Sequence, residues 1–315
     1  MSATGQFTAD PVLTAIAISY SNPAHHLIGA KVLPESPVVS DDFKYKQYDE
    51  AANFTVPDTR VGSRSSVRTI EIGGEEKTAS TADYGLGIPL DNRTITKAEK
   101  AGFKPREQAV EQATNIVQLD REIRVAGLVS NPASYHPALT QDITDADDRI
   151  GGANGKTYEI LMDMLDSCWM RPNQLTMGAA VWRALANDPV IVKKVGGAAA
   201  DGKKITPADV AGVLEVNEVL VGQSRVNIKR PGQNPVLERV WGNFIAGHFI
   251  DTSASFITGG MTWGATAKYG TTQAGTIPID IGVEGGIVVR SVESVTEVVL
   301  APLTGFLITH PITAA

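Results

Sequence analysis

A long helical stretch from Lys104 to Val129 constrains the fold of this 315-residue chain more than any other feature. Pro105 stands at the first helical position, where proline is tolerated because its missing N–H would have no partner there. The helix should end before Asn131-Pro132, because a residue that precedes proline avoids the α region. At 1.5 Å per residue the helix would span roughly 37 Å, about the width of a small domain. It is too polar for a membrane span, so we expect a strut packed on one side.

Apolar side chains recur along this helix at spacings of three and four residues, which places them on one face. The predicted stripe comprises Ala109, Ala113, Ile116, Asp120, Ile123 and Ala126, with Val110 and Val117 beside it. Arg121 and Arg124 lie off the stripe, so we expect both on the charged side of the helix. No catalytic motif lies on this stretch.

The composition is that of a globular chain that can bury a sizeable core, with 20% charged and 43% hydrophobic residues. The net charge is −7 and Lys and Arg are scattered, which disfavours sequence-specific binding of duplex DNA. The only cysteine, Cys168, excludes a disulfide framework, and we expect it to be a buried apolar residue. The sequence shows no signal-peptide pattern and no apolar run of about 18 residues. We therefore expect assembly in a reducing cytoplasm.

Residues 1–52 are expected to form an extended arm with one short helix that begins at Asp10-Pro11. Such a segment cannot bury itself, so it should lie along another surface of its own chain or of a neighbour. Residues 60–92 give the clearest strand signal. The turn signal Gly73-Gly74 predicts a hairpin in which the run from Glu75 to Tyr84 returns along residues 67–72. Because both strands are polar, we expect this hairpin to project and to find its partner on another subunit.

The second half of the chain predicts a compact α/β lobe followed by strands. The lobe should combine a short strand at 175–179, helices near 180–187 and 206–216, and strands at 218–228 and 238–250. The strand-rich segment 277–309 is expected to form one C-terminal sheet on which the long helix packs.

Two local patterns resemble ligand sites without meeting their requirements. Residues 151–157, GGANGKT, resemble a phosphate-binding loop, but the required first glycine is Ile150 and no apolar strand precedes the run. A glycine turn before a helix is the favoured interpretation. The acidic segment with Asp142, Asp145, Asp147 and Asp148 fails the calcium-loop pattern at Arg149, Ile150 and Lys156, so we expect a solvated loop.

The five histidines, His25, His26, His136, His248 and His310, show no metal-ligand spacing, and no nucleophile elbow is present. We therefore predict no catalytic residue, no cofactor-binding residue and no metal site, and we expect that the protein is not an enzyme.

The order of several segments resembles one family. LIGAKVLPESPVVS and FKYKQYD are followed by RVGSRSSV, DYGLGIPLDN, QLDREIRVAGLVSNPASY, RPNQLTMGAAVWRALANDPVIVKKV, LEVNEVLVGQSRVN and RVWGNFIAGHF. This run is similar to the major capsid proteins of tailed bacteriophages, which have the Hong Kong 97-like shell fold. The resemblance covers nearly the whole chain, and LDREIRVAGLV and RPNQLTMGAAVWRAL are its most specific parts.

The resemblance implies an α+β fold with four parts. These are an N-terminal arm (1–52), an extended E-loop hairpin (53–92), a P-domain with the spine helix (93–170) completed by C-terminal strands (265–315), and an A-domain (171–264). By the same resemblance, many copies form pentamers and hexamers of an icosahedral shell around double-stranded DNA. The charged side of the spine helix, with Arg121 and Arg124, would then lie on the inner wall or at a subunit boundary.

The resemblance also implies partners. Only about ten residues precede the first helix, so we expect a separate scaffolding protein, a portal, an optional decoration protein and no membrane. Some family members join subunits through a lysine–asparagine isopeptide bond. Lys77 lies in the E-loop, but nothing identifies its partner, so we predict noncovalent assembly. The alternatives are an encapsulin-type nanocompartment shell of the same fold and a soluble nucleotide-binding enzyme that uses residues 151–157.

Overall fold

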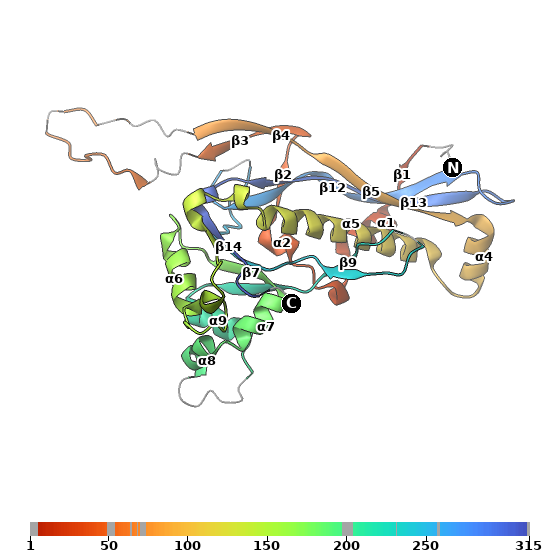
Figure 1. The fold of residues 1–315 in the computed structure, drawn as a ribbon. Helices are drawn as coiled ribbons and strands as arrows, with labels where there is room; N and C mark the ends of the chain where they lie inside the picture. Colours follow the sequence, from red (N-terminus) through yellow and green to blue (C-terminus); the bar gives the residue numbers. More distant parts are fainter. Residues whose placement is uncertain are drawn as a thin grey trace.

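The computed structural model describes residues 6–48, 54–63, 65–67, 69, 74–196, 204–230, 232–256 and 259–313. Figure 1 shows an elongated upper layer, an α/β lobe below one end of it, and a long projection that leaves the body at that same end.

The upper layer is a five-stranded sheet covered on one face by helices. Its strand order is β1-β12-β13-β5, and β2 also pairs with β12, at residues 266–269. Its strands are β1 (Thr8–Ala9), β2 (Glu35–Val38), β5 (Ala82–Asp91), β12 (Gly264–Ile279) and β13 (Gly286–Val299). Its helices are α1 (Pro11–Ser19), α2 (Gly29–Val32), α4 (Asn92–Lys100) and the long α5 (Pro105–Val129). The expectation that the long helix packs on C-terminal strands is confirmed, because α5 lies against β13 and β5.

The bounds predicted for the long helix are confirmed, but its buried face is rotated from the predicted stripe. Ala109, Ala113 and Ala126 are buried as expected. Ile116 is 50% exposed and Ile123 is 38% exposed, whereas Arg121 is 8% exposed. The rotation follows from polar partners that the sheet and the arm supply to Arg121 and to its neighbour Glu122.

The N-terminal arm lies along its own chain. Asp10 caps α1 as predicted, since its carboxylate accepts the backbone N–H groups of Val12 (2.8 Å) and Leu13 (3.3 Å). The hydroxyl of Thr14 donates to the carbonyl of Ala274 in β12 (2.9 Å). Strands β1 and β2 both pair with β12, β1 antiparallel and β2 parallel.

The projection is built from β3 (Asp42–Tyr48) and β4 (Gly74–Ser80), which pair antiparallel. The predicted pairing of the returning run with residues 67–72 is therefore wrong. Of the predicted turn at residues 73 and 74, residue 73 lies outside the described residues and Gly74 begins β4. The reason is aromatic packing: Phe43 and Tyr45 of β3 pack on the ring of Phe256, at centroid distances of 5.2 and 6.2 Å. The segment 67–72 has no aromatic side chain.

The lobe is a second five-stranded sheet, in the order β6-β14-β11-β7-β8, with helices around it. Its strands are β6 (Thr140–Asp142), β7 (Gln174–Gly178), β8 (Glu218–Gly222), β11 (Phe244–His248) and β14 (Gly305–Thr309). Its helices are α6 (Thr157–Ser167), α7 (Ala179–Ala186), α8 (Pro189–Gly196) and α9 (Pro207–Leu214).

Two predictions about the lobe are wrong. Strand β14 lies between β6 and β11, so the segment 305–309 does not extend the sheet of β12 and β13. Helix α6, placed in the P-domain from the sequence, packs into the lobe core through Leu161 and Leu165. A 3-10 turn at Pro302–Thr304 separates β13 from β14 and redirects the chain, which periodicity alone does not reveal.

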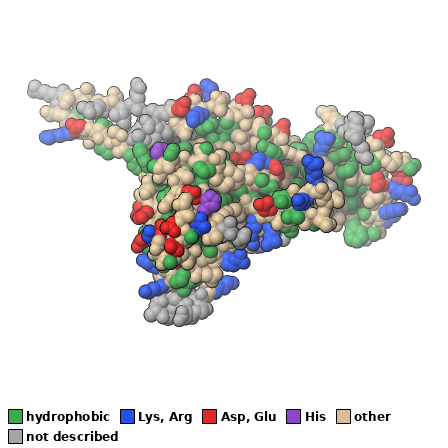
Figure 2. Space-filling view, viewed as in Figure 1, with side chains coloured by type: hydrophobic (Ala, Val, Ile, Leu, Met, Phe, Trp, Pro, Cys, Tyr) green, Lys and Arg blue, Asp and Glu red, His purple; other side chains and the backbone are tan. Residues whose placement is uncertain are grey.

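Short connecting elements complete the fold. Strands β9 (Arg225–Asn227) and β10 (Leu237–Arg239) form a separate two-stranded sheet below α5 (Figure 1). Further 3-10 turns cover Pro23–His25, Pro132–Ser134, Pro137–Leu139 and Ala146–Asp148. Figure 2 shows acidic, basic and hydrophobic side chains interspersed over this face of the molecule. No helix in the described part of the chain is long and apolar enough to span a membrane.

Candidate assembly site

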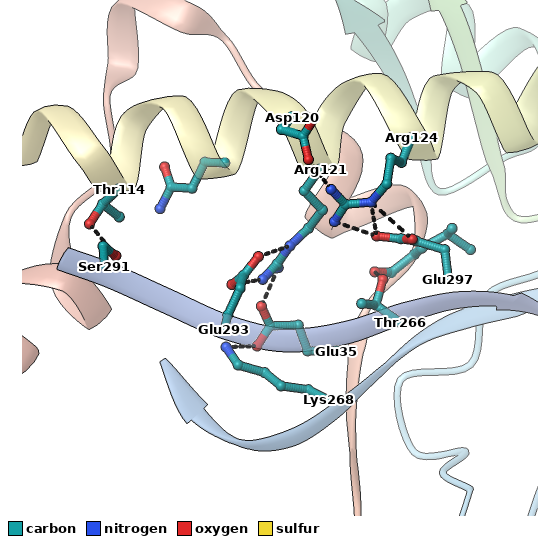
Figure 3. Close-up of polar contacts among 12 residues, drawn as sticks. Glu35, Thr114, Asp120, Arg121, Arg124, Thr266, Lys268, Ser291, Glu293 and Glu297 are labelled. Atoms are coloured by element: carbon teal, nitrogen blue, oxygen red, sulfur yellow. Dashed lines mark hydrogen bonds and ion pairs between the residues drawn. The ribbon is translucent and has the colours of Figure 1, made fainter. Parts of the chain in front are cut away.

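The centre of the upper layer is an ion-pair cluster between α5 and the sheet, comprising Glu35, Arg121, Lys268 and Glu293 (Figure 3). We call it the Arg121 cluster. The guanidinium of Arg121 contacts both carboxylate oxygens of Glu293, with Nε donating to Oε1 at 3.1 Å and Nη2 donating to Oε2. Its Nη1 donates to the Glu35 carboxylate. Bidentate arginine–carboxylate pairs are the stronger and more directional ion pairs, so this one fixes the angle of α5 over β13.

Glu35 is the member of the Arg121 cluster that belongs to the arm. It lies in β2, and its second carboxylate oxygen accepts a hydrogen bond from Lys268 Nζ of β12 at 2.9 Å. Burial alone would raise the pKa of Glu35, but the adjacent Arg121 and Lys268 hold this pKa below its ordinary value. The side chain is therefore ionised at neutral pH and joins arm, helix and sheet at one point.

Arg124 occupies a similar position one turn along the helix. Its Nη2 lies 3.1 Å from Glu297 Oε1, Nη1 contacts Asp120, and its guanidinium stacks 3.6 Å above the ring of Tyr84. The expectation that Arg121 and Arg124 face an inner wall or a subunit boundary is wrong, because both side chains point into the sheet of their own chain (Figure 3).

Glu122 connects α5 to the arm and the lobe. Its carboxylate accepts backbone N–H groups of Ile28 (2.9 Å) and Gly29 (2.6 Å), and the indole N–H of Trp241 (2.6 Å). The hydroxyl of Ser224 donates to it at 3.4 Å. A Cβ at Gly29 would come within 2.7 Å of the carboxylate, so a larger residue there would displace the Glu122 side chain.

These charged contacts were not predicted from the sequence, although a signal was present. Arg121 is four residues from both Val117 and Val125, so it shares a helix face with two buried valines. A charged residue at that position needs a buried partner. That partner lies 172 residues away in sequence, which no local pattern can show.

The Arg121 cluster and the Glu122 contacts hold the elements of the fold together. Arginine stays protonated, Glu35 stays ionised, and the Glu122 carboxylate is occupied by hydrogen-bond donors. Among the described residues, no group of three or more His, Cys, Asp or Glu side chains could hold a metal ion.

The segment that resembles a phosphate loop forms a turn before α6. Gly151 and Gly155 have positive φ values of 76° and 60°. The N–H of Gly151 and the hydroxyl of Thr157 both donate to Asp188, at 2.9 and 2.8 Å, and Lys156 pairs with Asp148 at 2.9 Å. The N–H, hydroxyl and ammonium groups that would bind a phosphate are thus already bonded to carboxylates, so this turn does not fit a nucleotide.

The acidic segment and the histidines are separate features. Asp145 caps the 3-10 turn Ala146–Asp148, while Asp142 accepts from His310 at 2.7 Å, and this hydrogen bond lowers the pKa of Asp142. His248 is fully buried against Tyr135 and Trp263, and burial lowers its pKa to about 3.

The expectation for Cys168 is confirmed. It is 8% exposed at the end of α6, and burial raises the pKa of its thiol to about 12, so the thiol stays protonated and unreactive at neutral pH.

Comparison with solved structures identifies the fold. The chain superposes with a TM-score of 0.76 on a phage-related protein from Bordetella bronchiseptica RB50, at 20% identity over 98% of this chain and 100% of that one. The TM-score is 0.55 with the putative capsid protein of a prophage of E. coli CFT073, at 9% identity over 96% and 99% of the two chains. It is 0.54 with the capsid of cyanophage P-SCSP1u, at 12% identity over 88% and 86%. The fold is the Hong Kong 97-like shell fold of phage capsid proteins, as the resemblance in sequence predicts.

The sequence relatives give the family. The chain is 39% identical to the major capsid protein of Pseudomonas phage JBD67 over 98% of both chains. It is 26% identical to the major capsid protein of Burkholderia phage BcepMu over 68% of this chain and 69% of that one. No protein-family model matches the chain. The chain belongs to the phage major capsid proteins, and its role is structural.

Proposed function

We propose that this protein polymerises into the closed icosahedral shell that encloses the double-stranded DNA genome of a tailed phage. The observation that carries the proposal is the β3–β4 projection. It extends away from the body of the molecule (Figure 1), and its strands pair only with each other among the described residues. An isolated two-stranded hairpin is marginally stable in water, so its energetics favour contact with a neighbouring subunit.

The parts of the subunit have roles in this proposal. We place the end of the arm at residue 41, where the sequence predicted residue 52, because β3 pairs with β4. The E-loop is then β3, β4 and the residues between them, where the sequence predicted residues 53–92. The P-domain comprises α4, α5, β5, β12 and β13. The A-domain is the lobe with β6 to β11, α6 to α9 and β14, and its tips meet around the axes of pentamers and hexamers.

Electrostatics favours a wall that does not bind the genome tightly. The net charge of −7 opposes general attraction to DNA, so the shell encloses the duplex without reading its sequence. Separate scaffolding, portal and decoration proteins would complete the particle, which would assemble in the host cytoplasm without any enzymatic activity of this chain.

Assembly is noncovalent in this proposal. Nζ of Lys77 in β4 lies 3.8 Å from Oε2 of Glu75, and both side chains are exposed on the projection. We expect denatured particles to give a monomer band alone on a gel. A ladder of multimers that survives boiling would contradict this expectation.

Electron microscopy of the purified protein tests the proposed function. Closed shells of uniform diameter are expected. A small oligomer that forms no shells under any condition would overturn the proposal. A nanocompartment shell is the second candidate, with less support because both curated relatives described above are phage proteins. Particles from infected cells that lack DNA and tails would favour it.

A further inference from the structure

The β9–β10 hairpin, residues 225–239, stands apart from both large sheets. Its two strands pair with each other and with no other strand in the described part of the chain. The side-chain oxygen of Asn227 accepts the backbone N–H groups of Lys229 (3.1 Å) and Val236 (3.0 Å), which stabilises the turn. A hairpin this small gains stability mainly by lying on another surface.

The hairpin is basic within an acidic chain. It holds four of the 28 basic residues and one of the 35 acidic residues, so 24 basic and 34 acidic residues remain in the rest of the chain. Its charged residues are Arg225, Lys229, Arg230, Glu238 and Arg239. No ion pair joins these four cations to a carboxylate among the residues that the structure describes. Figure 2 shows basic side chains along the lower edge of the molecule, in the region where Figure 1 places β9.

The hairpin also exposes apolar side chains. Ile228 is 54% exposed, Val236 is 44% exposed and Leu237 is 60% exposed. The N–H of Ile228 donates to the carbonyl of Val236 at 3.1 Å, so these two residues lie opposite each other across the hairpin. Exposed apolar groups rimmed by charge are typical of a surface that binds protein.

We propose that the β9–β10 hairpin docks on an acidic surface of a second copy of this chain, which rests on the proposed shell. The excess of carboxylates outside the hairpin supplies the complementary charge, and the apolar side chains form the dry centre of the contact. Duplex DNA fits less well, because phosphates would engage the cations but leave Ile228 and Leu237 in water. The cations then steer association and fix its register.

Charge reversal tests the electrostatic half of the proposal. Lys229→Glu combined with Arg230→Glu should raise the subunit concentration needed for half-maximal shell assembly at least tenfold, measured by sedimentation and microscopy. Glu238→Gln, which removes the opposite charge from the same hairpin, is the matched control and should assemble at least as well as the wild type. Both changes are at exposed positions, so an unchanged melting temperature of the unassembled subunit shows that folding is intact.

A photo-crosslinker identifies the partner. Ile228→Cys introduces an accessible thiol, and the buried Cys168 stays unlabelled, so a benzophenone maleimide attaches at the hairpin alone. Irradiation of assembled particles should give a dimer band whose new linkage joins the hairpin to an acid-rich peptide of another copy. Monomer bands alone, or adducts to DNA alone, would overturn the proposal.

The proposed shell and the proposed hairpin contact can be tested separately. If the wild-type protein forms no shells, the proposed function fails. If wild-type shells form and the charge-reversed variant assembles at the same concentration, only the hairpin contact fails.

Discussion

At the scale of single residues, two adjacent charges on α5 determine how the upper layer is held together. Arg121 faces the sheet and the arm, while Glu122 faces α2 and the lobe. Each is buried with its partners in place, because an unpaired buried charge is strongly unfavourable. These two side chains therefore specify one relative placement of arm, helix, sheet and lobe.

Removing the Arg121 guanidinium should destabilise the subunit strongly. Arg121→Met keeps most of the side-chain volume but leaves the Glu293 carboxylate, 4% exposed, without its cation. We expect the free energy of unfolding of unassembled subunits in urea to fall by about 3–5 kcal/mol.

Two further variants serve as controls for Arg121. Lys104→Met, which breaks an exposed pair with Glu107, should cost less than about 1 kcal/mol. The double variant Arg121→Met with Glu293→Met should recover much of the loss. A single-variant loss below about 1 kcal/mol would contradict a buried cluster.

His248 should make stability depend on pH. Its pKa in the folded state is about 3, lowered by burial from 6.5, so the unfolded chain binds the proton more readily between these values. The contribution of neutral His248 to the free energy of unfolding is fully present above pH 6.5. It decreases as the pH is lowered toward 3, with a slope of up to about 1.4 kcal/mol per pH unit.

Urea unfolding of wild type and of His248→Gln across pH 3.5–7.5 measures this slope. The variant should show a smaller slope even if it is less stable overall. His26→Gln, at an exposed site, is the control and should retain the wild-type slope. Identical slopes for wild type and His248→Gln would show that folding does not lower the pKa of His248.

At the scale of elements, α5 shows how polar partners outweigh a simple apolar pattern. Val110, Val117 and Val125 are buried, whereas Ile116 and Ile123, placed on the core stripe from their spacing, face outward. The helix is rotated toward the face that carries Arg121, because this face lies against Glu293 of β13 and Glu35 of the arm.

Adjacent residues test this rotation. Val117→Ala removes buried methyl groups and should lower the free energy of unfolding of unassembled subunits by about 1–2 kcal/mol. Ile116→Ala, at a half-exposed site on the same turn, should change it by less than about 0.5 kcal/mol. Chemical denaturation measures both values. A larger loss at Ile116 than at Val117 would show that the predicted stripe faces the core.

At the scale of the whole molecule, the long projection and the arm behave differently. The arm is held on its own sheet by β1, β2 and Glu35, so it belongs to the folded subunit. The projection contacts the body near its base, where Phe43 and Tyr45 meet Phe256, and through Phe54, whose ring lies 5.4 Å from that of Trp169. We therefore expect the projection, more than the arm, to contact neighbouring subunits.

Shortening the projection should separate folding from assembly. Deleting residues 55–69 removes most of the segment between β3 and β4 and leaves both strands. We expect subunits that melt within a few degrees of the wild type but form no closed shells. Calorimetry and electron microscopy measure the two properties. Shells of normal size and yield from this deletion would contradict the role of the projection.

The sequence predicted the features that depend on local chemistry. The bounds of α5 follow from Pro105 and from the proline at 132, and the start of α1 follows from the Asp10 cap. The helix predicted near 206–216 is α9, which begins at Pro207 directly after its N-cap Thr206. The order of specific segments predicted the capsid family, because a family resemblance accumulates along the whole chain.

The tertiary structure alone decided the features that depend on distant partners. The choice of β3 as the partner of β4, the insertion of β14 between β6 and β11, and the burial of Arg121 and Glu122 all join segments far apart in sequence. Spacing and propensity describe how a segment can bury its own side chains. They do not show which charge or strand the rest of the chain will bring to it.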